Sequence, residues 1–229
     1  FRVGRGVPWT AWLESYISPA VGCSNPASFR SVAVFPPPEG PRRERNGCAS
    51  TALASSSATV VAGRSTAARR AVAFDAMVSC IDKLPAASLV LLHACCHNPT
   101  GADLSPDQWR ALAAVIEHRG LVPFVDLAYQ GLGDDLETDA VGLRTLAERV
   151  PELLLAVSCS KNFGLYRERT GALAVISASN LARTAVATHQ ARLARRMYSM
   201  PPDHGAAIVA GVLADASLRQ YWEEEVSSM

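Results

Sequence analysis

From Phe74 onward, the chain alternates short apolar runs with polar segments that carry glycine or proline. Such bounded apolar runs predict buried strands over residues 89–94, 121–126, 153–160 and 171–177. A helix is expected near residues 140–150, between the second and third runs. Strands that alternate with helices predict a mostly parallel sheet that is flanked by helices and buried on both faces. The expected fold class is therefore α/β.

Residues 105–120 predict a helix with both of its ends marked. Ser105 is a suitable N-terminal cap, and Pro106 stands at the first helical position, where a proline is tolerated. Gly120 is expected to end the helix. One face of this helix carries apolar residues at positions i, i+3, i+4 and i+7, which are Trp109, Leu112, Ala113 and Ile116.

Polar side chains stand at the carboxyl ends of three predicted strands. Asn98 begins an Asn-Pro-Thr-Gly turn after the first strand, Asp126 closes the second, and Lys161 follows the third. Pro123 argues against a fully central position for the second strand, because a proline cannot donate to a ladder. In open α/β sheets, ligands bind outside the carboxyl ends of the strands. We therefore expect a ligand site at this edge.

The chemistry of these residues favours a pyridoxal phosphate site. Lys161 is one of only two lysines in the chain, and a partly desolvated lysine can supply the free amine that forms a Schiff base. Asp126 is costly to bury without a cationic partner, and a protonated pyridine nitrogen would serve as one. Arg169, eight residues after Lys161, offers a forked donor suited to a phosphate. Taken singly, the aspartate could be a helix cap or a metal ligand, and the lysine could be solvated.

Two other kinds of site fit the sequence less well. A metal site could use His93, Cys95, Cys96 and His97, but side chains that alternate in direction along a strand do not converge on one ion. We therefore expect no metal. A dinucleotide site would need a G-x-G-x-x-G sequence after a strand, and the chain has none.

Composition narrows the class of protein further. The formal net charge of +1 gives no electrostatic case for nucleic acid or an anionic membrane. The apolar run at residues 206–214 is too short to span a bilayer. Six cysteines without C-x-x-C spacing favour a reducing cytoplasm. A start at Phe1 and a helix pattern still running at residues 221–226 indicate a piece of a larger protein.

Residues 1–73 differ from the rest of the chain. They hold nine arginines but no lysine or aspartate, together with a triple proline and a low-complexity run at residues 49–58. No helical or strand periodicity is sustained there. We expect an atypical, disordered or aberrant segment, and a genuine subdomain is the alternative.

Four motifs, in the same order along the chain, resemble the class I aspartate and aromatic amino acid aminotransferases. The resemblance is nearly continuous from about Phe74 to Met229, and the motifs occupy residues 93–101, 126–131, 158–169 and 198–205. It implies the pyridoxal-phosphate-binding large domain of the fold type I transferases over residues 74–229, in incomplete form. The C-terminal small domain of that family has no counterpart in these residues.

The resemblance implies a role for each matching residue around the cofactor. Lys161 would form the internal aldimine and then move a proton between the substrate Cα and the cofactor C4′. Asp126 would pair with the pyridinium nitrogen, with His93 close to the ring. Asn98 and Tyr129 would hydrogen-bond the phenolic oxygen and lower the aldimine pKa. The phosphate ligands would be Ser158 and Arg169.

The resemblance also implies a substrate and an oligomeric state. The reaction would move an amino group between aspartate or an aromatic amino acid and 2-oxoglutarate, and the sequence leaves that preference open. Arg195 matches a residue that reaches across a dimer interface to the side-chain carboxylate of a dicarboxylic substrate, which implies a homodimer. Asn98 would also contact the substrate.

Some family features have no match in this sequence. A Ser-Gly-Thr-type phosphate loop and a tryptophan that stacks on the cofactor ring would both fall within residues 1–73, where no segment matches either family motif. The arginine for the substrate α-carboxylate belongs to the small domain. Thr170 replaces an aliphatic residue, a change we expect to be tolerated. The alternative function is therefore a non-catalytic, truncated remnant of such an aminotransferase.

Overall fold

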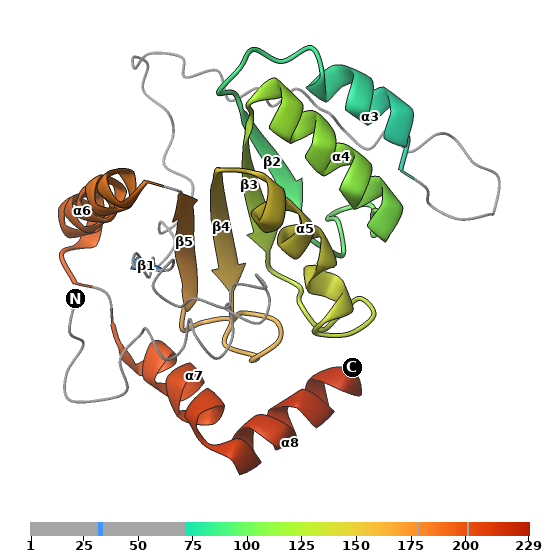
Figure 1. The fold of residues 1–229 in the computed structure, drawn as a ribbon. Coiled ribbons are helices and arrows are strands. Elements are labelled where there is room, and N and C mark those ends of the chain that lie inside the picture. The colour runs from blue at the N-terminus through green and yellow to red at the C-terminus, as the bar shows by residue number, and fades with distance from the viewer. Residues whose placement is uncertain (1–31, 34–71, 178, 201) are drawn as a thin grey trace.

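The sheet has five strands in the order β1-β5-β4-β3-β2 (Figure 1). The computed structural model describes residues 32–33, 72–177, 179–200 and 202–229. β2, β3 and β4 are parallel, whereas β5 runs antiparallel to β4 and β1 runs antiparallel to β5. The strands are β1 (Val32–Ala33), β2 (Leu89–His93), β3 (Val122–Leu127), β4 (Glu152–Ser158) and β5 (Gly171–Ser177). The four strands predicted from the apolar runs are thereby confirmed, as is the mostly parallel sheet.

The expectation drawn from Pro123 is wrong, because β3 is flanked by β2 on one side and by β4 on the other. Pro123 pairs with Val90 of β2. The pairing with β4 begins only at Phe124, one residue after the proline. The missing N–H therefore lies where the strand starts, which is a position that tolerates proline even in a central strand.

Helix α4 (Pro106–Arg119) has the ends that the sequence predicts. Ser105 accepts a hydrogen bond from the backbone N–H of Gln108, and the Gln108 side chain accepts one from the N–H of Ser105. Gly120 ends the helix with φ of +60°, in the left-handed region that glycine adopts without strain. The residues buried along the helix are the four predicted ones, Trp109, Leu112, Ala113 and Ile116.

One face of the sheet is covered by α3 (Phe74–Ile81), α4 and α5 (Val141–Arg149), which a short 3-10 turn, η3 (Thr138–Ala140), precedes (Figure 1). The helix expected near residues 140–150 is α5. Trp109 of α4 lies so close to Gly142 that a Cβ there would stand 2.2 Å from the indole ring. Buried side chains of these helices and of β2, β3, β4 and β5 form one apolar core.

Three further helices complete the described part of the chain. α6 (Asn180–Tyr198), which the sequence analysis did not predict, packs beside β5 and β1. α7 (His204–Ala214) and α8 (Ala216–Ser227) lie beneath the edge at which β3 and β4 end (Figure 1). This placement brings the last helix of the described chain to the edge where the sequence predicts a ligand site.

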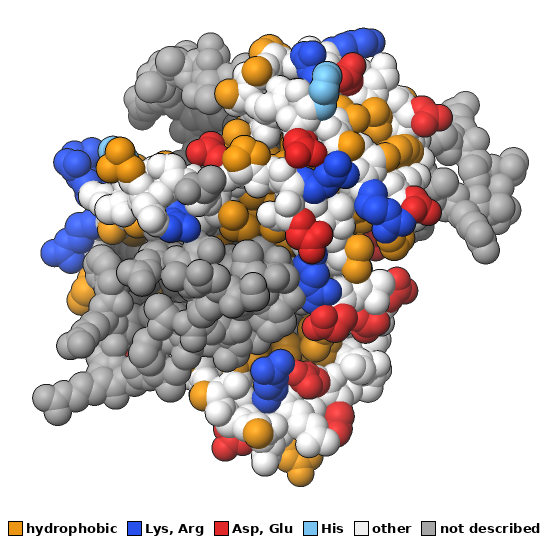
Figure 2. All heavy atoms as spheres, in the orientation of Figure 1, with side chains coloured by type: hydrophobic (Ala, Val, Ile, Leu, Met, Phe, Trp, Pro, Cys, Tyr) orange, Lys and Arg blue, Asp and Glu red, His pale blue; other side chains and the backbone are white. Residues whose placement is uncertain are grey.

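The surface agrees with the small net charge. On the face shown in Figure 2, acidic and basic side chains are interspersed over the described residues. None of the helices that the structure describes is both long enough and apolar enough to cross a membrane. Of the atypical segment at residues 1–73, the structure describes only residues 32–33 and 72–73, so the rest of that segment lies outside the described residues.

Candidate active site

The parallel strands β2, β3 and β4 end at one edge of the sheet, where two of the residues singled out in the sequence are paired. His93 of β2 pairs with Asp126 of β3, and Asp126 pairs in turn with Ala156 of β4. Residues paired across a parallel ladder present their side chains on the same face of the sheet. The side chains of His93 and Asp126 therefore lie on the same face of the sheet, at paired positions of neighbouring strands.

Asp126 is held at the end of β3 by its backbone. Its carbonyl oxygen accepts a hydrogen bond of 2.9 Å from the N–H of Ala94. The side chains of Val125 and Leu127 on either side enter the apolar core, so that of Asp126 lies on the opposite face, where it is half-buried. Among the described residues, no hydrogen-bond donor or cation contacts this carboxylate. A partly buried carboxylate of this kind suits a cationic ligand.

Lys161, Tyr129 and Asn98 form a contiguous group. The Nζ atom of Lys161 lies 4.3 Å from the centroid of the Tyr129 ring, which is the geometry of a cation–π contact. The Nδ2 atom of Asn98 donates to the Tyr129 hydroxyl at 3.3 Å. The backbone N–H of Asn98 donates to Nδ1 of His93, also at 3.3 Å. Contacts therefore run without a break from the lysine to the histidine that lies beside Asp126.

Lys161 stands in a loop that is closed at its base. The N–H of Cys159 donates to the carbonyl of Thr170 at 3.0 Å, and Ser158 pairs with Gly171 across β4 and β5. Within the loop, the N–H of Gly164 donates to the carbonyl of Lys161 at 3.0 Å. This closure fixes where the loop leaves the sheet and where it returns.

The two predicted phosphate ligands lie at opposite ends of this loop. The Ser158 hydroxyl accepts a hydrogen bond from the N–H of Ser160 at 3.2 Å. Arg169 has φ of +53° and donates from Nη1 to the carbonyl of Tyr166 at 2.8 Å. Within the described residues, the two side chains do not contact each other. Their common role therefore stays a prediction.

Arg195 and Thr170 lie away from the lysine. Arg195 is on α6 with an exposed side chain, and it makes no contact with the other predicted site residues. Thr170 is buried where α7 begins, and a Cβ on Gly205 would stand 2.2 Å from its hydroxyl. The threonine thus packs against α7.

Burial disfavours the charged forms of three thiols and of the His97 imidazole near this edge. Burial raises the pKa of Cys159 to about 12. It also raises the pKa of Cys95 and of Cys96. Burial, and secondly the neighbouring His93, lowers the pKa of His97. Because the pKa values of the three thiols are raised, these thiols are unsuited to act as nucleophiles at neutral pH.

Across the described part of the chain, no group of three or more His, Cys, Asp or Glu side chains is arranged to hold a metal ion.

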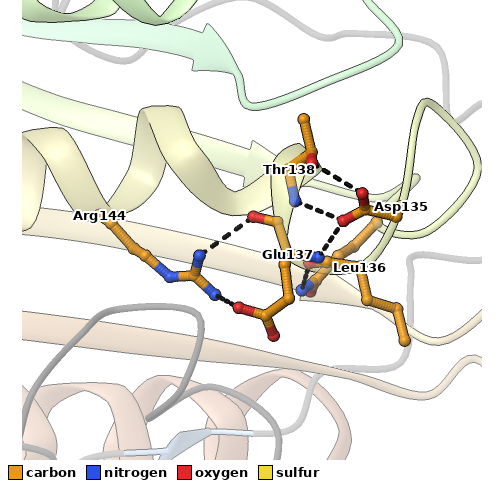
Figure 3. A network of polar contacts seen from close by, with 6 residues as sticks. Asp135, Leu136, Glu137, Thr138 and Arg144 are labelled. Carbon is orange, nitrogen blue, oxygen red and sulfur yellow. Dashed lines mark hydrogen bonds and ion pairs between the residues drawn. The ribbon is translucent and has the colours of Figure 1, made fainter.

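The loop after Tyr129 is built around two aspartates. Asp139 is buried and accepts hydrogen bonds from the N–H groups of Gly131, Gly133 and Asp134, at 2.8, 3.0 and 3.1 Å. Figure 3 shows the outer part, where Asp135 accepts from the N–H of Glu137 and from both the N–H and the hydroxyl of Thr138. Arg144 of α5 contacts the carbonyl and carboxylate of Glu137 (Figure 3). These bonds fix the loop that follows Tyr129.

Sequence reasoning missed two buried residues beside the lysine, Asn162 and Trp222. The side chain of Asn162 donates to the carbonyl of Gln130 at 3.1 Å, and the indole N–H of Trp222 donates to the carbonyl of Asn162 at 2.7 Å. Asn162 could have been suspected because it directly follows Lys161. Nothing in the local sequence connects Trp222 to a turn that lies 60 residues before it.

Comparisons with known proteins identify the family of this chain. The sequence model of the family described as aminotransferase class I and II matches residues 49–229. The tyrosine aminotransferase of Rhizobium meliloti is 52% identical over 160 residues, which are 70% of this chain and 41% of that protein. The aspartate aminotransferase of Haemophilus influenzae is 45% identical over 163 residues, which are 71% of this chain and 41% of that protein.

Solved structures give the same result. An aromatic-amino-acid aminotransferase from Burkholderia pseudomallei, covalently bound to pyridoxal phosphate, matches with a TM-score of 0.67 and 44% identity. The match covers 69% of this chain and 40% of that one. The chain thus spans about two fifths of the length of the relatives it matches. Because the family model covers most of the sequence and the fold agrees, this chain belongs to the aminotransferase class I and II family.

Proposed function

We propose that this chain carries the lysine half of a pyridoxal-phosphate-dependent aminotransferase site. The reaction moves an amino group between aspartate or an aromatic amino acid and 2-oxoglutarate. The observation that carries the proposal is the position of the Lys161 amine over the Tyr129 ring, at the edge where the neighbouring strand ends just after Asp126. The names of the relatives, which include tyrosine and aspartate aminotransferases, support both classes of donor.

The described residues fit the proposed cofactor by their chemistry. A pyridine nitrogen that carries a proton would complement the Asp126 carboxylate, which has no cationic partner among the described residues. Asn98 and Tyr129 offer an amide and a hydroxyl donor for a phenolic oxygen, and they already contact each other. The remaining predicted ligands, for the phosphate, are Ser158 and Arg169. When bound, pyridoxal phosphate supplies an electron sink for the substrate carbanion.

Lys161 carries the proton transfer in this proposal. Its amine would hold the cofactor through the aldehyde carbon and, once released, would take the proton from the substrate Cα and return it at the acceptor carbon. Lys83, the other lysine of the chain, is exposed in the segment between α3 and β2 and does not belong to this edge. The aromatic face under Nζ limits where the side chain can point.

Substrate carboxylate binding and assembly are part of the same proposal. The exposed guanidinium of Arg195 on α6 is free to reach a site on a second subunit, where it would bind a carboxylate in a bidentate manner. A homodimer follows from that role, because Arg195 contacts none of the other predicted site residues in its own chain. The proposed location is the cytoplasm, as the cysteine spacing suggests.

The decisive experiment compares the two lysines. Pyridoxal phosphate is added to the purified chain, to Lys161→Ala and to Lys83→Ala, and the visible absorption of bound cofactor is recorded after gel filtration. We expect the absorption to be lost only in Lys161→Ala. No binding by the unchanged chain, or equal binding by all three, would refute the proposed cofactor site.

Turnover separates the two functional alternatives. Aspartate, tyrosine and phenylalanine are each tested as amino donors to 2-oxoglutarate with the cofactor-loaded chain. Amino transfer from any of them that is lost in Lys161→Ala supports the aminotransferase. Bound cofactor without transfer from any of the three would instead favour the non-catalytic remnant.

A further inference from the structure

We propose that Asn162 and Trp222 are positioning residues that, through helix α8, hold the Lys161 amine over the Tyr129 ring. The inference concerns the geometry of this chain, and only its meaning for catalysis rests on the proposed function. Lys161 and Tyr129 come from loops that follow different strands, β4 and β3. The β3–β4 ladder pairs its last residues at Leu127 and Val157, so the ladder itself does not fix the distance between the two loops.

Asn162 connects the two loops directly. It follows Lys161 in the sequence, and its side chain is only 2% exposed. Its Nδ2 atom donates to the carbonyl of Gln130 at 3.1 Å, and Gln130 is the residue after Tyr129. The hydrogen bond therefore joins the immediate neighbours of the two residues in the cation–π contact. A buried hydrogen bond of this kind is costly to break, because water cannot easily reach the two buried groups to replace it.

Trp222 of α8 holds Asn162 from the other side. The indole Nε1–H donates to the Asn162 carbonyl at 2.7 Å. The Trp222 ring also stacks on Phe163, with centroids 4.4 Å apart and an angle of 11° between the planes. Trp222 is itself buried, so this side chain fixes both residues that follow the lysine.

The next turn of α8 contacts the loop that follows Tyr129, here called the tyrosine loop. Val226, four residues after Trp222 and so on the same helix face, lies against Gly131. A Cβ on Gly131 would stand 2.5 Å from Val226 Cγ1, and Gly131 has φ of +88°, which only glycine adopts readily. One face of α8 therefore holds the lysine loop through Trp222 and the tyrosine loop through Val226. The helix acts as a clamp on the contact between Lys161 and Tyr129.

The composition of the chain allows a direct test without cofactor. Lys83 and Lys161 are the only lysines, so reductive methylation with 13C-formaldehyde gives two lysine methyl signals besides that of the amino terminus. The variant Lys83→Arg assigns them. An amine over the face of an aromatic ring is shielded, so the Lys161 signal should lie upfield of the Lys83 signal. The variant Tyr129→Leu should remove that displacement and so calibrate it.

Trp222→Phe is the test variant, because it keeps an aromatic ring against Phe163 and deletes only the indole donor and part of the ring. Trp109→Phe is the matched control, since Trp109 is equally buried but packs against α5. We expect the Lys161 signal to lose most of its upfield displacement in Trp222→Phe and to keep it in Trp109→Phe. An unchanged Lys161 signal in folded Trp222→Phe, or an equal loss in both variants, would overturn the proposal.

Val226→Ala provides a second, milder variant if Trp222→Phe does not fold, as judged by circular dichroism. It shortens the side chain that contacts the tyrosine loop, so we expect a smaller loss of the displacement, and no loss would again overturn the proposal. In the cofactor-loaded chain, Trp222→Phe should lower amino transfer by up to about 100-fold, as a misplaced reactive group does. The spectrum of the free chain does not depend on cofactor binding, so failure of the proposed function and failure of the clamp are distinguishable.

Discussion

The two aspartates of the loop after Tyr129 provide a quantitative test of how that loop is held. Each accepts three hydrogen bonds, but Asp139 is 5% exposed and Asp135 is exposed. Hydrogen bonds to a charged acceptor contribute roughly 1.5–3 kcal/mol each. After Asp139→Ala, the N–H groups of the exposed residues Gly133 and Asp134 can bind water, whereas that of Gly131 stays buried. We therefore expect a loss of about 1.5–3 kcal/mol in the free energy of unfolding, nearly all of it from the Gly131 N–H.

The matched control is Asp135→Ala, which removes the same number of hydrogen bonds from solvent-exposed positions. Its expected cost is below about 1 kcal/mol, because water replaces the carboxylate. Urea unfolding followed by circular dichroism, with the chain and both variants at the same pH, gives the three free energies. Equal losses for the two variants would show that burial of the Asp139 carboxylate does not govern the stability of this loop, and the reasoning would be refuted.

Two further predictions concern packing and pH. Gly142→Ala should destabilise the chain by about 1–3 kcal/mol, because its Cβ would collide with the Trp109 ring. Gly211→Ala in α7, with open space around it, should instead stabilise the chain by about 0.5–1 kcal/mol. Urea unfolding measures both changes, and changes of equal sign would contradict the packing argument. Burial and then His93 lower the pKa of His97, so below about pH 6.5 the unfolded chain binds a proton that the folded chain does not, and stability falls as the pH drops. His97→Gln should lose part of this fall between pH 7.5 and 5.5, and an identical pH dependence in both proteins would disprove it.

The sequence predicted elements whose signals are local. The helix from Ser105 to Gly120 was predicted with its cap and its buried face, because those features depend on residues within a few positions of one another. The β4 and β5 strands were predicted from their apolar runs. Pro123 misled because its effect depends on where pairing with β4 begins, and that register is a property of two strands rather than of one.

The site was predicted to the level of strand ends. The sequence predicted that Asn98, Asp126 and Lys161 belong to strand ends at one edge, and β2, β3 and β4 do run parallel. The contact of Lys161 with Tyr129 and the role of α8 were not predictable, because they depend on how loops leave the sheet. The resemblance supplied Tyr129 as a site residue, whereas the buried side chain of Asn162 needed the structure.

Because the residues of α8 that hold the lysine loop come late in the chain, the Lys161 side chain can be oriented only late in synthesis. The chain leaves the ribosome with its amino-terminal part first, and the strands that deliver Lys161 and Tyr129 emerge well before Trp222. Trp222 follows Asn162 by 60 residues, with α6 and α7 between them. A nascent chain can therefore form the strands of its sheet while the Lys161 amine still lacks its final orientation, and that orientation arises only from a late, long-range contact.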